Sequence, residues 1–250
     1  MLEKINEIAI EAGKKIMQIY GMADFSAITD FKADNSPLTL ADKEANKIIE
    51  EGLKKLAPHI PIISEEGKDV PYEVRKDWKE FWLVDPLDGT KEFIKRNGEF
   101  TVNIALMRDN APVMGTIYAP AFDVLYYGEK GKGAWKTEKE KTERLATKTS
   151  KDKIVAVGSR SHGAPEELEV QKRYGVTDAI STGSSLKFCL LAEGKADVYY
   201  RHGPTMEWDT AAGQAILEAA GGRVLKPDME KFTYNKTTLL NGSFLALGSL

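Results

Sequence analysis

The first 56 residues contain two segments in which apolar side chains return every three or four positions. In residues 1–20 the apolar members are Ile5, Ile8, Ala9, Ala12, Ile16 and Ile19. In residues 39–56 the same spacing joins Ala45, Ile48, Ile49 and Leu53. This period places apolar residues on one face of a helix and leaves the charged residues on the other. The pattern predicts two amphipathic helices, each lying on the core of its own domain.

Short apolar runs of a different kind come next. Ile62 and Ile63 lead into an acidic turn at residues 64–67, and residues 81–84 form a continuous apolar run before a second acidic turn at residues 85–90. A continuous run of this length is typical of a strand buried on both faces. Three β-rich segments then recur at hairpin spacing, at residues 101–107, 113–118 and 124–127. Together they predict an antiparallel meander.

The second half of the chain alternates between strand and helix patterns. Strands are expected at residues 154–157, 196–200, 223–225 and 244–247, and helices at residues 165–174, 184–193 and 210–220. Before them, residues 136–153 are dominated by Lys, Glu and Thr, which predicts a solvated connector. We therefore expect a layered α/β protein with an N-terminal half at 1–150 and a C-terminal half at 151–250.

Composition narrows the class of protein. A chain of 250 residues with 42% hydrophobic residues can fill a substantial core, and its net charge of −3 argues against a nucleic-acid polymer as partner. The single cysteine, Cys189, cannot form an internal disulfide, and its apolar neighbours predict a buried small side chain. Residues 1–20 resemble neither a signal peptide nor a membrane span. We expect a cytoplasmic protein without membrane insertion.

Carboxylates occur where predicted elements begin or end. They are Asp42, the pair Glu65 and Glu66, Asp85 with Asp88, and Asp209. Each one alone is also explained as a helix cap or a surface turn. Grouped carboxylates, however, repel one another unless a cation neutralises them, and oxygen ligands without Cys or His suit Mg²⁺. Taken together, these acids predict a divalent-metal site.

The turn at residues 85–90 is the most informative of these signals. Pro86 restricts the backbone, Gly89 permits a positive φ, and the carbonyl of Leu87 lies between two carboxylates. The hydroxyl of Thr90 is then expected beside the metals, where it can orient a water. Asp209 precedes the small residues 211–213, so we expect it to cap a helix that another element or a ligand approaches closely.

These segments resemble a known family. Glu65-Glu66, the string Asp-Pro-Leu-Asp-Gly-Thr at 85–90 and the string Trp-Asp-Thr-Ala-Ala-Gly at 208–213 are similar, in order and separation, to the three signatures of the inositol monophosphatase superfamily of Mg²⁺-dependent, lithium-inhibited phosphatases. Residues 91–104 and 203–208 resemble its 3'(2'),5'-bisphosphate nucleotidase branch more than its inositol phosphatases. The resemblance implies an α/β fold, a layered αβαβα sandwich of the inositol monophosphatase / fructose bisphosphatase type.

The resemblance also implies roles for individual residues. The implied ligands of two or three Mg²⁺ ions are Glu65, Asp85, the carbonyl of Leu87, Asp88 and Asp209. The implied catalytic residues are Glu65, Thr90 and Asp34, with Glu66 acting through a water. The implied substrate-binding residues are Gly89, Thr90, Ser159, His162, Gly183, Ser184, Lys187, Arg201 and Asp209.

The activity implied is removal of the 3'-phosphate of adenosine 3',5'-bisphosphate by direct attack of an activated water, giving AMP and phosphate. Two alternatives stay open at this stage: a sugar phosphatase acting on inositol 1-phosphate or fructose 1,6-bisphosphate, and a relative that binds metal and nucleotide without turnover. The sequence also leaves open the number of ions, the formation of a homodimer, and the preference among 3',5', 2',5' and sulfated nucleotides.

Overall fold

The computed structural model describes residues 1–22, 29–31, 37–148, 152–159 and 164–250. The helices are α1 (Leu2–Tyr20), α2 (Leu40–Leu56), α3 (Tyr72–Arg75), α4 (Thr90–Ile94), α5 (Pro165–Arg173), α6 (Leu186–Ala192) and α7 (Glu207–Ala219). Within these ranges, no helix combines the length and the apolar character that crossing a bilayer requires.

The strands form two main sheets. The seven-stranded sheet runs in the order β3 (Ile62–Ser64), β4 (Glu80–Asp88), β5 (Thr101–Arg108), β6 (Ala111–Ala119), β7 (Val124–Glu129), β8 (Gly133–Glu138) and β9 (Lys141–Leu145). The five-stranded sheet runs in the order β11 (Asp178–Thr182), β10 (Val155–Ser159), β12 (Val198–Arg201), β16 (Phe244–Leu247) and β14 (Arg223–Leu225). Two small pairs complete the set, β1 (Thr29–Phe31) with β2 (Pro37–Thr39) and β13 (Thr205–Met206) with β15 (Leu240–Asn241).

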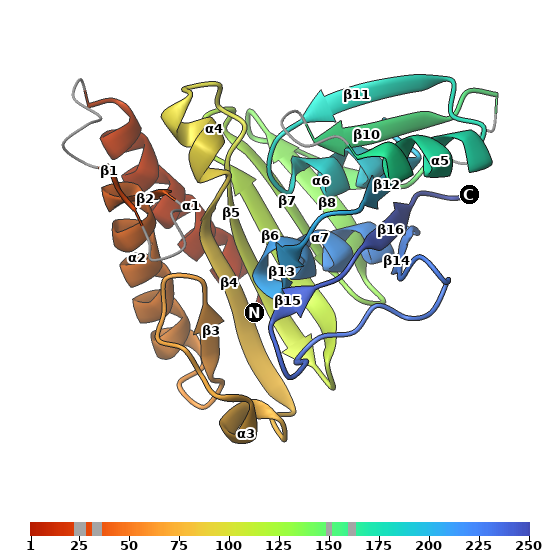
Figure 1. Cartoon of the computed structure of the whole chain (residues 1–250). Coiled ribbons are helices and arrows are strands. Elements are labelled where there is room, and N and C mark those ends of the chain that lie inside the picture. The colour runs from red at the N-terminus through yellow and green to blue at the C-terminus, as the bar shows by residue number, and fades with distance from the viewer. Residues whose placement is uncertain (23–28, 32–36, 149–151, 160–163) are drawn as a thin grey trace.

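Helices α1 and α2 cover one face of the seven-stranded sheet (Figure 1). The predicted apolar stripes are the buried ones: Ile5, Ala9 and Ile16 of α1 share a core with Ile49 of α2 and with the sheet. Both predicted helices are therefore confirmed. From β4 to β9 each strand pairs antiparallel with the next, as the meander prediction requires, and only β3 joins in parallel.

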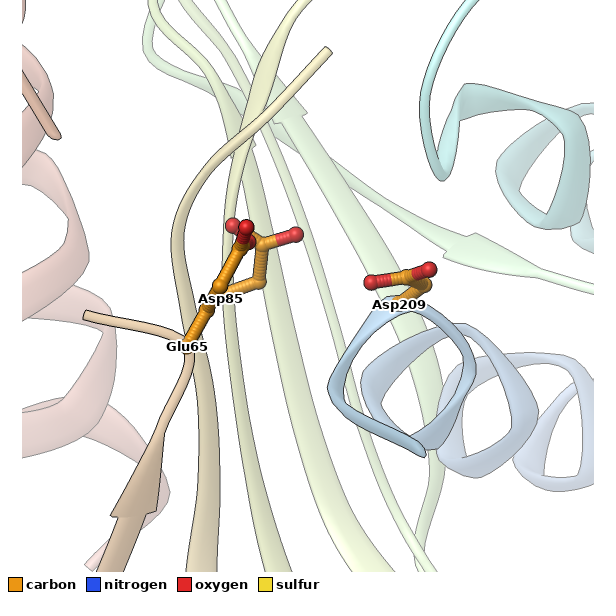
Figure 2. Close-up of side chains that lie close together, drawn as sticks. All are labelled: Glu65, Asp85 and Asp209. Atoms are coloured by element: carbon orange, nitrogen blue, oxygen red, sulfur yellow. The ribbon is translucent and has the colours of Figure 1, made fainter. Parts of the chain in front are cut away.

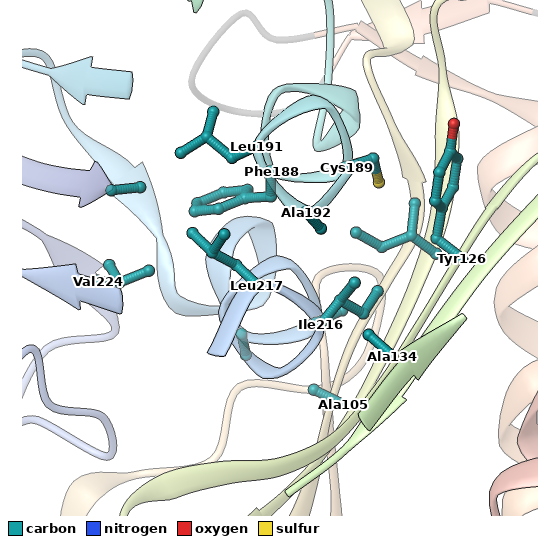
Figure 3. Packing of buried hydrophobic residues seen from close by; sticks show 14 of the residues in the cluster. Ala105, Tyr126, Ala134, Phe188, Cys189, Leu191, Ala192, Ile216, Leu217 and Val224 are labelled. Carbon is teal, nitrogen blue, oxygen red and sulfur yellow. The ribbon is translucent and has the colours of Figure 1, made fainter. Parts of the chain in front are cut away.

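Helices α6 and α7 lie between the two sheets and bury the largest core (Figures 1 and 3). Phe188 and Cys189 of α6 share this core with Ile216 and Leu217 of α7, and Cys189 is 1% exposed, so the expected burial of the cysteine is confirmed. Helix α5 packs on the outer face of the five-stranded sheet. The order of layers is helix, sheet, helix, sheet, helix, and the predicted αβαβα sandwich is confirmed.

The prediction of a solvated connector at residues 136–153 is wrong over its first part. Residues 133–138 and 141–145 form β8 and β9, the last two strands of the large sheet. The prediction failed because it took polar composition as a sign of a loop. An edge strand is held by hydrogen bonds to its neighbour's backbone, so it can form without apolar side chains. Four of the five residues of β9 are exposed, whereas its ladder to β8 is continuous.

Candidate active site

A β-bulge shapes the second acidic turn, at residues 85–90. Asp85 pairs with Asn103 and Asp88 pairs with Thr101, so two residues of β4 stand opposite one residue of β5. On a regular strand, residues three apart point to opposite faces, and the bulge removes this alternation. The backbone N–H of Leu87 donates to Asp85 Oδ1 at 3.1 Å, and Gly89 has the positive φ of 92° that was expected. Helix α4 begins at the next residue.

Three carboxylates converge at the end of this turn. One oxygen each of Glu65, Asp85 and Asp209 lies within 4.8 Å of the others. Figure 2 shows that Glu65 comes from the segment after β3, Asp85 from β4, and Asp209 from the first turn of α7. Asp88 and the backbone of Leu87 line the same cleft. The structure therefore brings together the five residues that were predicted as metal ligands.

Asp209 caps α7 from inside its first turn. Its Oδ2 accepts a hydrogen bond of 2.8 Å from the backbone N–H of Met206, two residues before Trp208. The expected N-cap position is thus taken by Met206, and Asp209 is the third residue of the helix. Asp209 also lines the acidic cleft, so the residue that caps the helix contributes a carboxylate to the cluster.

The electrostatics of the cluster favour a cation. Burial first, and then the neighbouring carboxylates Glu65 and Asp88, raise the pKa of the Asp85 carboxyl well above its ordinary value. Burial and the charge of Asp88 do the same to the pKa of Asp209. Carboxylates held together in this way are the ligands that Mg²⁺ prefers, and the donors are all oxygen. The residues present therefore fit a divalent metal.

Thr90 contacts Asp42. Sequence reasoning included Asp42 among the grouped carboxylates but did not pair it with Thr90. Thr90 Oγ1 donates to Asp42 Oδ1 at 3.3 Å and lies 3.4 Å from the carbonyl oxygen of Leu87. Asp42 is buried in the first turn of α2, where its other oxygen accepts the backbone N–H of Thr39 at 2.8 Å. The capping pattern Thr39-x-x-Asp42 was the sequence signal that could have placed Asp42 in the first turn of α2. Asp34, which was predicted as a catalytic residue beside Thr90, lies outside the described residues.

A second cavity of about 180 Å³ adjoins the acidic cleft and shares Asp88, Gly89 and Asp209 with it. Most of the predicted substrate residues line this cavity: Gly89, Gly183, Ser184, Lys187, Arg201 and Asp209. Thr90 lines the acidic cleft instead. His162 and the side chain of Ser159 lie outside what the structure describes, and the backbone of Ser159 ends β10. Sequence reasoning missed Glu92 and Tyr199, which also line the cavity.

The cavity carries polar groups that have no partner in the described part of the chain. They are the hydroxyl of Ser184, whose φ is 47°, and Nε of Arg201, both buried. Lys187 Nζ donates to the carbonyl of Ser184 at 2.6 Å, and burial lowers the pKa of this lysine. Buried donors of this kind are costly unless something accepts from them, so the cavity is suited to an anion.

A layered αβαβα sandwich that gathers carboxylates from three separate segments, together with the family match, defines this chain as a metal-dependent phosphatase. The model of the inositol monophosphatase family matches residues 1–248. The chain therefore belongs to the inositol monophosphatase family.

Similar proteins are found in several bacteria. The chain is 51% identical over 224 residues to the 3'(2'),5'-bisphosphate nucleotidase CysQ of Salmonella typhimurium. The matched segment covers 90% of this chain and 89% of that protein. The chain is 49% identical over 226 residues to the protein of the same name from Escherichia coli, with the same coverage. The crystal structure of CysQ from Bacteroides thetaiotaomicron superposes with a TM-score of 0.88 at 46% identity, over 100% of this chain and 97% of that one.

Proposed function

We propose that this protein hydrolyses the 3'-phosphate of adenosine 3',5'-bisphosphate, releasing AMP and phosphate. The observation that carries the proposal is the 51% identity, across 90% of the chain, to a protein named 3'(2'),5'-bisphosphate nucleotidase. The acidic cluster and the adjoining cavity with its buried cations support it, because such a substrate carries two phosphates that need separate subsites.

The metal-binding side of the site is assigned to the carboxylates of Glu65, Asp85, Asp88 and Asp209 and the carbonyl of Leu87. Bound divalent ions polarise a phosphate ester and lower the pKa of a coordinated water. The fold already gathers the ligand oxygens in one cleft, so little rearrangement is needed when charge develops during the reaction.

Thr90 and Asp42 are assigned to the attacking water. Because the hydroxyl of Thr90 donates to Asp42, its oxygen is left as an acceptor that can orient one hydrogen of a water. The water oxygen attacks phosphorus while the bond to the 3'-oxygen breaks. The water gives up one proton and the departing 3'-oxygen takes up one, so the products are AMP and inorganic phosphate. No phosphoenzyme is formed. Asp34 retains its role as a prediction from the family resemblance.

The phosphate that remains on AMP is assigned to the cavity beside the metal cleft. Lys187 and Arg201 supply positive charge there, and the Ser184 hydroxyl supplies an unpaired donor. In this proposal residues 1–150 carry most metal ligands, while residues 151–250 carry the last one and the substrate residues. Two or three Mg²⁺ ions, a homodimer and a cytoplasmic location remain predictions.

The test is a comparison of initial rates at saturating Mg²⁺. We expect adenosine 3',5'-bisphosphate, its 2',5' isomer or its sulfated form to be hydrolysed with a kcat/KM well above that for inositol 1-phosphate and fructose 1,6-bisphosphate. A preference for either sugar phosphate would replace the proposal with a sugar phosphatase. Absence of turnover on every substrate would indicate a binding protein. Excess EDTA should abolish the activity, which controls for a contaminating metal-independent phosphatase.

A further inference from the structure

Asp88 differs from the other carboxylates of the site in its hydrogen bonds. Its Oδ2 lies 2.7 Å from the hydroxyl of Ser185 and 3.3 Å from the amide nitrogen of Asn103. Asn103 comes from β5, and Ser185 immediately precedes α6. Both are 1–2% exposed, so water does not compete for these groups. One oxygen of Asp88 is thus held by the protein from two sides.

The orientation of the Asn103 amide is determined by a third buried residue. Thr101 Oγ1 donates to Asn103 Oδ1 at 2.9 Å, so the NH₂ group of the amide is the part that faces Asp88 and Ser185. The same NH₂ donates its other hydrogen to Ser185 Oγ at 2.8 Å. Because Ser185 accepts from Asn103, its single hydrogen is available for an acceptor on the site.

Ser185 also reaches the last candidate metal ligand. Its Oγ lies 2.9 Å from the backbone carbonyl oxygen of Asp209 as well as beside Asp88. One hydroxyl hydrogen serves one of these two acceptors at a time, and both acceptors belong to residues that line the acidic cleft. The pair of Asn103 and Ser185 therefore joins β5 and the start of α6 to β4 and α7 at the site.

We propose that Asn103 and Ser185 are positioning residues that fix the carboxylate of Asp88 for metal binding. By occupying Oδ2, they direct the remaining oxygen, Oδ1, toward the cation and hold one rotamer of the carboxylate. Partners of this kind raise metal affinity because the ligand needs no reordering on binding. The inference rests on the metal-dependent chemistry proposed above, and its test reads metal binding without substrate.

The experiment is a Mn²⁺ titration of the full chain, with free Mn²⁺ measured by electron paramagnetic resonance. Ser185→Ala removes the hydroxyl, and Asn103→Leu removes both amide donors at similar volume. Each variant is expected to raise the Kd for Mn²⁺ about 10- to 100-fold. Ser185→Thr retains a hydroxyl and is expected to stay near the wild-type Kd. The Mg²⁺ concentration needed for half-maximal activity should rise in parallel, while kcat recovers at saturating Mg²⁺.

Thr116→Val is the matched control. Thr116 is a buried residue of the neighbouring strand β6, and its hydroxyl donates to Asn6 Oδ1 of α1 at 2.7 Å. This hydrogen bond lies on the face of the sheet that α1 covers, away from the site. Thr116→Val should lower Tm as much as Ser185→Ala does and leave the Kd for Mn²⁺ unchanged. If Ser185→Ala binds Mn²⁺ as the wild type does, the proposal is wrong; this smaller change carries the test even where Asn103→Leu does not fold. Failure of the proposed function would instead appear as a wild type that binds Mn²⁺ without hydrolysing the nucleotide.

Discussion

Asp85 and Asp88 serve one cleft only because the strand that carries them is irregular. A two-residue period would point them to opposite faces of the sheet. Pro86 cannot donate to the ladder, and Pro86 and Leu87 together stand opposite one residue of β5, so the bulge brings both carboxylates to the cleft that Asp209 of α7 also lines. The placement of Asp85 and Asp88 in one candidate metal site therefore depends on the bulge in β4.

Lys187 supplies the first residue-scale prediction. Its Nζ is buried beside Ser184 in the cavity assigned to the retained phosphate. Lys187→Ala removes a charge-assisted hydrogen bond worth roughly 1.5 to 3 kcal/mol, so KM for adenosine 3',5'-bisphosphate should rise about 10- to 100-fold. Hydrolysis of a nucleoside 3'-monophosphate should change little, because that substrate lacks the second phosphate. Steady-state kinetics on both substrates measure the difference.

Lys187→Met controls for packing, since it keeps the length of the side chain without the charge. It should behave like Lys187→Ala toward the bisphosphate and should lose less Tm. An equal rise in KM for both substrates would show that Lys187 does not read the second phosphate, and the cavity would then need another ligand.

At the scale of elements, the site depends on how closely α7 approaches its neighbours. A Cβ added at Gly213 would lie 2.4 Å from the ring of Phe188 on α6, and one at Gly115 of β6 would lie 2.4 Å from the carbonyl oxygen of Ala212. The small residues that follow Asp209 in sequence therefore allow the second turn of α7 to pack against both the sheet and α6. This confirms the close approach that the sequence predicted for them.

Gly213→Ala should therefore destabilise the fold by about 1 to 3 kcal/mol through overpacking, in spite of the better helix propensity of alanine. Urea unfolding monitored by circular dichroism measures the change. Gly21→Ala, directly after α1, is the comparison, because the φ of −76° at Gly21 suits alanine and the new Cβ would meet only backbone carbonyl oxygens, none nearer than 3.5 Å. That variant should be neutral or more stable. Equal losses in the two variants would mean that the packing of α7 is not the reason.

At the scale of the whole molecule, the acidic centre makes stability depend on metal and pH together. Burial and mutual repulsion raise the pKa values of Asp85 and Asp209 above their values in the unfolded chain. The metal-free fold therefore loses stability as pH rises from the unfolded pKa, near 4, through the raised folded pKa. A divalent ion competes with protons for the same oxygens and restores this loss, more completely at higher pH.

Mg²⁺ should consequently raise Tm more at pH 7.5 than at pH 5. At a hundred times its Kd, one bound ion adds about 2.7 kcal/mol, or roughly 5 to 10 °C for a chain of this size. Scanning calorimetry with Mg²⁺ and with EDTA at both pH values provides the measurement. Asp85→Asn removes one buried charge, so its metal-free Tm should hold at pH 7.5 while the effect of Mg²⁺ shrinks and turnover falls by several orders of magnitude. A Tm shift by Mg²⁺ that is the same at both pH values would contradict this account.

The elements whose signals are local could be predicted from the amino-acid sequence alone. The apolar spacing of α1 and α2, the continuous apolar run of β4 and the hairpin turns of the meander follow from one stretch of chain each. The candidate metal ligands could be proposed for the same reason, because Asp85, Leu87 and Asp88 lie in one turn and Glu65 and Asp209 in short motifs of their own.

The tertiary structure decided what depends on contacts between distant residues. The polar strand β9 exists because β8 offers it a backbone partner, which its composition does not reveal. Asp42 reaches Thr90 across 48 positions, and Ser185 reaches Asp88 across 97. No local pattern encodes such pairs, since they form only when packing of the two sheets around α6 and α7 brings the segments together and excludes water from them.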